Sequence, residues 1–180
     1  MFRAVMVSVI ALGMFWVVAQ SMGKTPAQRE ADLLRAEINR EDGLAYLERK
    51  RHADGVHVFP DGLLVRVEHA GDGASPEPEQ WVRVHYRGAH LDGRVFDSSW
   101  RRQQPVTLRV DKTIEAWQRV LPGMREGGRV WLLAPPRLAY GTQGSGPIGP
   151  EESLVFEIHL LEVLEEPTVA ATTSSALAAQ

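Results

Sequence analysis

The sequence predicts an α+β fold in which an antiparallel sheet of short strands closes over one short helix. Two observations lead to this prediction. Segments that alternate apolar and polar residues recur between positions 56 and 163, and Gly, Pro and Asp residues separate them. One segment at 113–121 instead places Ile114, Trp117 and Leu121 at spacings of three and four residues, which is the period of a helix face.

The composition limits the chemistry that the chain can perform. Its 180 residues suffice for one domain of ordinary size with extensions. A net charge of -3 and a pI near 6.1 give no reason to expect a nucleic-acid partner. The absence of cysteine excludes disulfides and thiol chemistry. The histidines show no metal-ligand spacing, so we expect no metal or cofactor, and we expect surface positions for His52, His57, His69, His85, His90 and His159.

Residues 1–24 predict a targeting segment. Arg3 is the only charge before Lys24, and the residues between them are almost wholly apolar or small. We favour a secretory signal peptide that is cleaved after Ala19. The alternative is an uncleaved signal anchor, with residues 4–23 in the inner membrane, because the uncharged run approaches the ~20 residues that a spanning helix needs. Under both interpretations the rest of the chain lies on the far side of a membrane, outside the cytoplasm. We therefore expect a periplasmic or secreted protein.

Residues 25–54 predict an N-terminal helical segment. Thr25 suits the N-cap, Pro26 suits the first helical position, and Gln28 completes a capping box. Gly43 weakens the helix near its end. A narrow apolar stripe consists of Ala27, Ala31, Leu34 and Ile38. Such a helix cannot form a hydrophobic core by itself, so we expect it to dock on the domain or on a second copy of the chain. We expect this docking to be weak and the protein to be mostly monomeric.

The segment 81–99 predicts the central hairpin. Val82, Val84 and Tyr86 alternate with polar residues, which indicates a half-buried strand. The turn at 91–93 contains Asp and Gly, which tolerate the positive φ of a tight hairpin. The returning strand brings Phe96 and Asp97 near Tyr86. Aromatic rings beside one short acid are typical of a recognition surface, and the alternative is an ordinary hairpin with aromatic core residues.

Further strands are predicted around this hairpin. Their signals lie at 56–58, 63–67, 106–110, 130–134 and 153–163, of which the last is the longest. Asp111 or Thr113 suits the cap of the short helix. Residues 140–150 form a loop rich in Gly and Pro. Residues 165–180 contain almost no large apolar side chain, and we expect them to be disordered.

Four motifs follow one another in this chain: VHYRG at 84–88, DGRVFDSS at 92–99, AYG at 139–141 and GPIGPEESLVFEIHLLEV at 146–163. In these motifs the chain resembles FKBP-type peptidyl-prolyl cis-trans isomerases. More narrowly, it is similar to the macrophage infectivity potentiator group of secreted bacterial isomerases. The resemblance implies an isomerase domain over residues 55–164, with a curved antiparallel sheet wrapped around one short α-helix and an apolar pocket between them.

The resemblance also implies roles for individual residues. The Ile114 N–H would hold the substrate carbonyl, the Tyr140 hydroxyl would donate a hydrogen bond, and Arg102 would pair with Asp97. Carried over in this way, the catalytic residues are Tyr86, Phe96, Asp97, Ile114, Trp117, Tyr140 and Phe156, and the substrate-binding residues are Arg102, Val106, Thr113 and Ile148.

A site of this kind needs no nucleophile. Rotation about a Xaa-Pro bond faces a barrier of roughly 20 kcal/mol, because the twisted amide loses its resonance. An apolar aromatic pocket favours the twisted amide, which costs less to desolvate than the planar form. The expected partners are proline-containing unfolded or partly folded polypeptides in the envelope, and the expected inhibitors are the macrolides tacrolimus and rapamycin.

Some residues depart from the family pattern. Val106 stands where some members have a phenylalanine, Thr113 replaces a common valine, and Glu115-Ala116 replaces a frequent Pro-Gly. Ala116 would add a methyl group beside the pocket floor. These departures leave an alternative function open, which is a non-catalytic FKBP-like binding or chaperone module.

Overall fold

The computed structural model of the chain describes residues 24–164. The predicted targeting segment, apart from Lys24, and the predicted disordered tail at 165–180 lie outside these residues. Within 24–164, no helix is both long enough and apolar enough to cross a membrane. The described residues fall into two units, residues 24–35 and residues 36–164.

Helix α2 spans Pro26–Lys50 and contains residues of both units. The capping box is confirmed, because the Gln28 N–H donates to Thr25 Oγ1 at 3.2 Å and the Thr25 N–H donates to Gln28 Oε1 at 2.8 Å. These reciprocal bonds satisfy N–H groups that no helical carbonyl can reach. The start of the helix is therefore decided by local sequence.

The second half of α2 packs on the sheet domain through Gly43 rather than through the predicted stripe. Gly43 is the only buried residue of the described helix. A Cβ atom on it would lie 2.6 Å from Ser153 Oγ, so only glycine fits without a shift. The Asn39 amide donates to the Pro150 carbonyl at 2.7 Å, whereas Ile38 is 50% exposed. Gly43 is thus a docking contact as well as a weak helix former.

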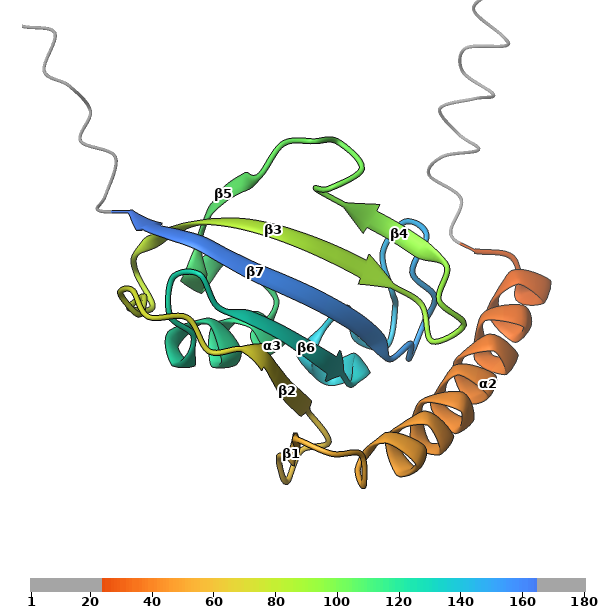
Figure 1. The fold of residues 1–180 in the computed structure, drawn as a ribbon. Helices are drawn as coiled ribbons and strands as arrows, with labels where there is room; N and C mark the ends of the chain where they lie inside the picture. The colour runs from red at the N-terminus through yellow and green to blue at the C-terminus, as the bar shows by residue number, and fades with distance from the viewer. Residues whose placement is uncertain (1–23, 165–180) are drawn as a thin grey trace, which may run out of the picture. The chain divides into compact units, whose positions relative to one another are not determined.

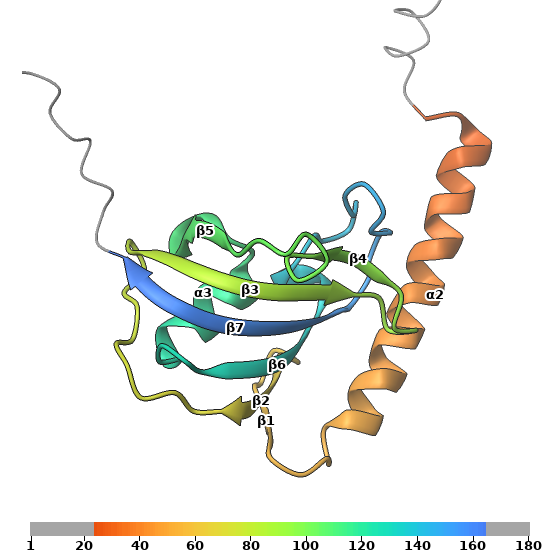
Figure 2. The ribbon, with the colours of Figure 1, turned by 45° about the horizontal axis from the view of Figure 1, so that its top comes forward.

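Seven strands form one sheet, in the order β1-β2-β6-β7-β3-β4, with β5 paired to β3 beside this path. All pairings are antiparallel. The strands are β1 Val56–Val58, β2 Leu64–His69, β3 Trp81–Ala89, β4 Val95–Ser98, β5 Val106–Arg109, β6 Arg129–Ala134 and β7 Leu154–Leu164. Strands β3 and β7 lie side by side along most of their length (Figures 1 and 2).

The short helix α3, Glu115–Val120, packs on one face of this sheet (Figure 1). Trp117 and Leu121 join a buried cluster with strand residues such as Val84, Leu132 and Leu160. The opposite face carries a smaller cluster around Leu64, Trp131, Leu133 and Val155, against which Tyr46 and Leu47 of α2 pack. The predicted α+β fold, with a curved antiparallel sheet and one short helix after an N-terminal helix, is confirmed.

The predicted cap of α3 is wrong. The helix begins at Glu115, and its N-cap Ile114 makes no side-chain capping bond. Residues Val110–Lys112 form a separate 3-10 turn. The Thr113 hydroxyl donates to the Val110 carbonyl at 2.7 Å, and the Asp111 carboxylate accepts from Arg109 at 2.6 Å. Both predicted caps are therefore engaged in the preceding turn.

Candidate functional site

A cavity of about 680 Å³ opens between α3 and the sheet. This volume lies in the range of small-ligand sites in proteins. The sheet supplies side chains from β3, β4, β5 and β7, and the remaining ones come from residues 112–117 and 137–140. All the residues that the sequence predicted as catalytic line it, namely Tyr86, Phe96, Asp97, Ile114, Trp117, Tyr140 and Phe156, and so do Val106 and Thr113.

The floor of the cavity is a chain of aromatic rings that meet edge to face. Trp117 is 4% exposed. Its ring centroid lies 5.3 Å from that of Tyr86 and 5.7 Å from that of Phe156, at interplanar angles of 77° and 87°. Phe156 in turn meets Phe96 at 5.9 Å and 84°. Edge-to-face pairs are favourable because the positive ring edge meets the negative face of the next ring. The rings therefore form a fixed apolar surface.

Gly88 makes room for two of these rings. It lies on β3 directly opposite Phe156 on β7 and Asp97 on β4. A Cβ atom here would lie 2.5 Å from Phe96 Cζ and 3.1 Å from Phe156 Cε1. The register of β4 shifts between Asp97 and Val95, so Phe96 occupies a bulge. The glycine and the bulge together let the Phe96 ring cross over the strand.

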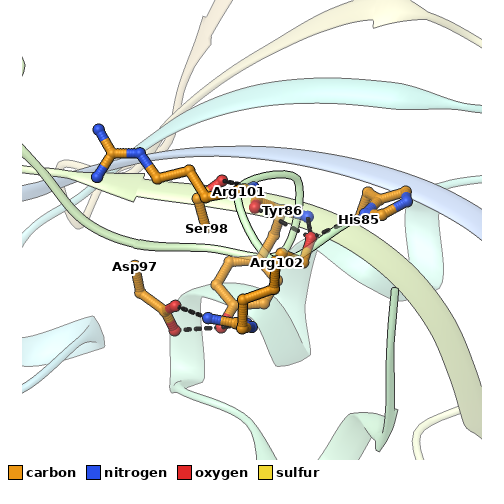
Figure 3. A network of polar contacts seen from close by, with 7 residues as sticks. His85, Tyr86, Asp97, Ser98, Arg101 and Arg102 are labelled. Atoms are coloured by element: carbon orange, nitrogen blue, oxygen red, sulfur yellow. Dashed lines mark hydrogen bonds and ion pairs between the residues drawn. The ribbon is translucent and has the colours of Figure 1, made fainter. Parts of the chain in front are cut away.

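One wall of the cavity is polar and fully paired (Figure 3). The Tyr86 hydroxyl donates to Asp97 Oδ2, and the Arg102 guanidinium pairs with Asp97 Oδ1. Arg102 also donates to the Tyr86 oxygen at 3.2 Å. Behind them, the buried Ser99 hydroxyl accepts from the Tyr86 N–H at 2.8 Å and contacts His85 Nδ1 at 2.9 Å. This network holds Tyr86 and Asp97 in one arrangement.

The network also decides which groups are charged. Burial acts to raise the pKa of Asp97, but hydrogen bonds from Tyr86 and Arg102 outweigh it, and the pKa lies below its usual value. The pKa of Tyr86 is raised, first by burial and then by its bond to Asp97. Near neutral pH, Asp97 is therefore a carboxylate and Tyr86 a neutral phenol. Both groups orient a ligand better than they exchange protons with it.

Two further donors lie at the cavity. Ile114 precedes α3 with an extended backbone, φ −63° and ψ 151°, and a backbone N–H at a helix start has no intrahelical acceptor. Tyr140 is 37% exposed, and burial together with the nearby Asp97 charge raises the pKa of its hydroxyl, which stays protonated. In addition, Trp117 Nε1 is the one buried side-chain polar atom of residues 24–164 that lacks a hydrogen-bond partner.

Comparison with known proteins agrees with this geometry. A family model described as FKBP-type peptidyl-prolyl cis-trans isomerase matches residues 73–161. The crystal structure of FkpA from Escherichia coli superposes with a TM-score of 0.76 at 33% identity, over 87% of this chain and 71% of that chain. The chain belongs to the FKBP-type peptidyl-prolyl cis-trans isomerase family.

Sequence relatives place this FKBP-type chain in the Mip and FkpA group. It is 40% identical to the peptidyl-prolyl cis-trans isomerase Mip of Coxiella burnetii over 126 residues, and this aligned segment covers 69% of this chain and 55% of the relative. It is 36% identical to FkpA of Escherichia coli K12 over 149 residues, and this aligned segment covers 83% of this chain and 54% of the relative. The chain thus spans about half the length of these relatives. The resemblance to the macrophage infectivity potentiator group is confirmed.

Three of the residues that were expected at or beside the cavity do not line it, namely Arg102, Ala116 and Ile148. Ile148 is 6% exposed and belongs to the core rather than to the cavity lining, and its backbone forms an isolated antiparallel bridge with Ser145. Arg102 pairs with Asp97, as the resemblance implied, but its own side chain does not line the cavity. The methyl group of Ala116 is fully buried in the core and is not part of the lining, since the next residue, Trp117, takes the cavity side of the helix.

The prediction of surface positions for all histidines is wrong for His90, which is 8% exposed. Its ring is held between Glu152 and Phe96, so burial is compensated by pairing. Among residues 24–164, no three acidic or histidine side chains gather as metal ligands would.

The sequence prediction also missed residues of the lining. These are Leu108, Lys112, Glu115, Arg137 and Ala139. Leu108 follows Val106 by two residues on β5, so strand alternation could have indicated it.

Proposed function

We propose that this protein is a peptidyl-prolyl cis-trans isomerase that helps secreted or envelope proteins to fold. The observation that carries the proposal is the aromatic cavity itself. It combines a rigid apolar floor with an Asp97 carboxylate whose hydrogen-bonding capacity is engaged by Tyr86 and Arg102. Asp97 and Tyr86 are held by each other and by Arg102, and their pKa values are shifted away from neutral pH, Asp97 downward and Tyr86 upward. Such a site suits a reaction in which a bond rotates and none breaks.

In this proposal the cavity lowers the rotational barrier by binding the twisted amide better than the planar one. The proline ring lies on Trp117, between Tyr86 and Phe156. A planar amide carries more charge separation than a twisted one, so the apolar floor penalises the planar form more. The Ile114 N–H and the Tyr140 hydroxyl hold carbonyl groups of the substrate chain. Asp97 orients Tyr86 and takes up no proton.

The test is a proline-isomerisation assay with the purified protein and peptides that carry a bulky apolar residue before proline. We expect catalysis that tacrolimus or rapamycin blocks, with a change in Trp117 fluorescence, because these macrolides occupy family pockets. Absence of catalysis under conditions in which the protein is folded would overturn the proposal. That result would favour the alternative, a non-catalytic binding or chaperone module. Binding of a permanently unfolded protein without any isomerisation would then support this alternative.

We further propose that the protein acts in the periplasm or as a secreted protein. The support comes from the apolar segment before Lys24. A relative in Legionella longbeachae, 39% identical over 139 residues, is named outer membrane protein MIP. Fractionation of cells that carry the full chain tests the location, and N-terminal sequencing of the mature protein tests cleavage after Ala19. Recovery of the whole protein in the cytoplasm would overturn this proposal.

A further inference from the structure

The cavity wall has a buried acid–base pair behind it. His90 follows β3 in the hairpin turn, where its N–H donates to the Arg94 carbonyl at 2.9 Å. The His90 side chain is only 10% exposed and that of Glu152 only 14%. His90 Nδ1 contacts Glu152 Oε1. A carboxylate only accepts hydrogen bonds, so Nδ1 carries the hydrogen.

Glu152 connects two parts of the chain. Its second oxygen, Oε2, accepts from the Gly149 N–H at 2.7 Å. The carboxylate therefore joins the β3–β4 hairpin to the loop that leads into β7. This loop also begins at the cavity, because Tyr140 precedes it and the Glu151 N–H donates to the Gly141 carbonyl at 3.1 Å.

The other face of His90 touches the cavity wall. The His90 ring meets the Phe96 ring edge to face, with centroids 5.3 Å apart and planes at 69°. Phe96 lines the cavity and continues the aromatic chain through Phe156 to Trp117. His90 does not line the cavity. It is therefore the outermost ring of a chain that ends at the floor of the site.

The surroundings of the pair include three other charged side chains, Asp42, Asp92 and Arg94. A small hollow beside it is lined by Asn39 and Asp42 of α2 and by Leu91, Asp92 and Arg94 of the hairpin. Asp92 and Arg94 pair with each other at 2.6 Å and are well exposed. Removing His90 would leave Glu152 with the Gly149 N–H as its remaining partner, and removing Glu152 would leave the buried His90 Nδ1 without its partner, which costs free energy.

We propose that His90 and Glu152 are positioning residues for the cavity. Together they hold the Phe96 ring against Phe156 and fix the end of the loop after Tyr140, so they set the shape of the site without touching a substrate. This inference rests on the proposed isomerase function. It assigns a role to His90, the only buried histidine among residues 24–164.

The test compares His90→Ala, Glu152→Ala and the double variant with Arg94→Ala as the matched control. Arg94 lies in the same turn, but its ion pair is exposed. We expect each single variant to lower kcat/KM by about fivefold or more, because small misplacements of positioning groups are costly. The double variant should lose no more than the worse single variant, since both remove the same connection. Arg94→Ala should leave kcat/KM unchanged.

A second readout separates positioning from stability and from the proposed function. The Trp117 indole N–H has no partner, so its NMR signal reports directly on the aromatic floor. We expect this signal to shift in the His90 and Glu152 variants and to stay in place in Arg94→Ala. Glu152→Gln, which retains an acceptor oxygen, should recover part of both effects.

The outcomes are distinguishable. Lower melting temperatures with unchanged kcat/KM and an unchanged Trp117 signal would overturn the positioning role. If the parent protein itself lacks turnover, the isomerase proposal fails, whereas the Trp117 signal still decides whether the pair shapes the cavity. All measurements are made well below the melting temperature, with folding checked by circular dichroism.

Discussion

The Tyr86 hydroxyl donates to the Asp97 carboxylate across the β3–β4 hairpin, over a separation of 11 residues. Arg102 approaches the same pair and donates to both partners. Asp97 is thus the common acceptor of a phenol and a guanidinium. Its removal releases two side chains at once, one of which lines the cavity.

Asp97→Leu is expected to reduce kcat/KM by roughly tenfold, which corresponds to one charge-assisted hydrogen bond of about 1.5 kcal/mol. Without the carboxylate, Tyr86 and Arg102 lose the group that fixes them. The isomerisation assay measures this change. Arg83→Leu is the control, because Arg83 is exposed on β3 and pairs with Glu162 away from the cavity. Equal activity of the two variants would show that the site is misplaced.

The pH dependence follows from the directions of two pKa shifts. The folded-state pKa of Asp97 lies below its usual 3.8, so its contribution to stability is complete above about 3.8 and is lost as the pH falls through the folded-state value. The pKa of Tyr86 lies above its usual 10.0, so its contribution is complete below 10.0 and is lost as the pH rises through the folded-state value. Melting temperatures across the pH range check both directions.

The same shifts predict that kcat/KM is flat from about pH 6 to pH 8, because neither Asp97 nor Tyr86 titrates there. A pH–rate profile with a constant, non-titrating peptide substrate checks this. A bell-shaped profile centred in this range would indicate acid–base participation and would contradict an orienting role for Asp97.

Phe156→Ala is expected to destabilise the domain by about 3–5 kcal/mol, because Phe156 is 3% exposed and touches both Phe96 and Trp117. Urea unfolding measures the loss. Turnover should also fall at temperatures at which the variant is folded, since the floor loses its central ring. Phe156→Leu, which keeps more of the volume, should cost less in both measurements.

Tyr140→Phe is expected to leave stability unchanged, because Tyr140 is 37% exposed. The variant loses one hydrogen bond to the substrate, worth about 0.5–1.5 kcal/mol. A decrease in kcat/KM that is smaller than that of Asp97→Leu is the expected result. A loss larger than that of Asp97→Leu would require a more direct role for the Tyr140 hydroxyl.

Gly43→Ala is expected to destabilise the protein, although alanine is the better helix former by about 1 kcal/mol. The new Cβ atom would lie 2.6 Å from Ser153 Oγ. Ser153→Ala should relieve part of the clash, so the double variant should melt above the Gly43→Ala single variant. Glu41→Ala, at an exposed position of the same helix, is the control for helix propensity alone. A higher melting temperature for Gly43→Ala would mean that α2 does not dock through Gly43.

The sequence by itself determined the features that depend on near neighbours. The capping box of Thr25 and Gln28 closes within one helical turn. The turn at Gly93 has a φ of 88°, as expected for a glycine in a tight hairpin. The strand at 153–163 could be predicted because its alternation is local. The family motifs added part of the site, because five of the predicted residues that line the cavity lie in them, namely Tyr86, Phe96, Asp97, Tyr140 and Phe156.

Only the tertiary structure decided which side chains are buried and how they pair. Gly43 and Ser153 are far apart in sequence, as are His90 and Glu152, and no local pattern links either pair. The sequence likewise could not show that Ala116 enters the core while Trp117 faces the cavity, since both lie on one short helix. Burial depends on what the sheet brings against a residue, and sheet register joins segments that are distant in the chain.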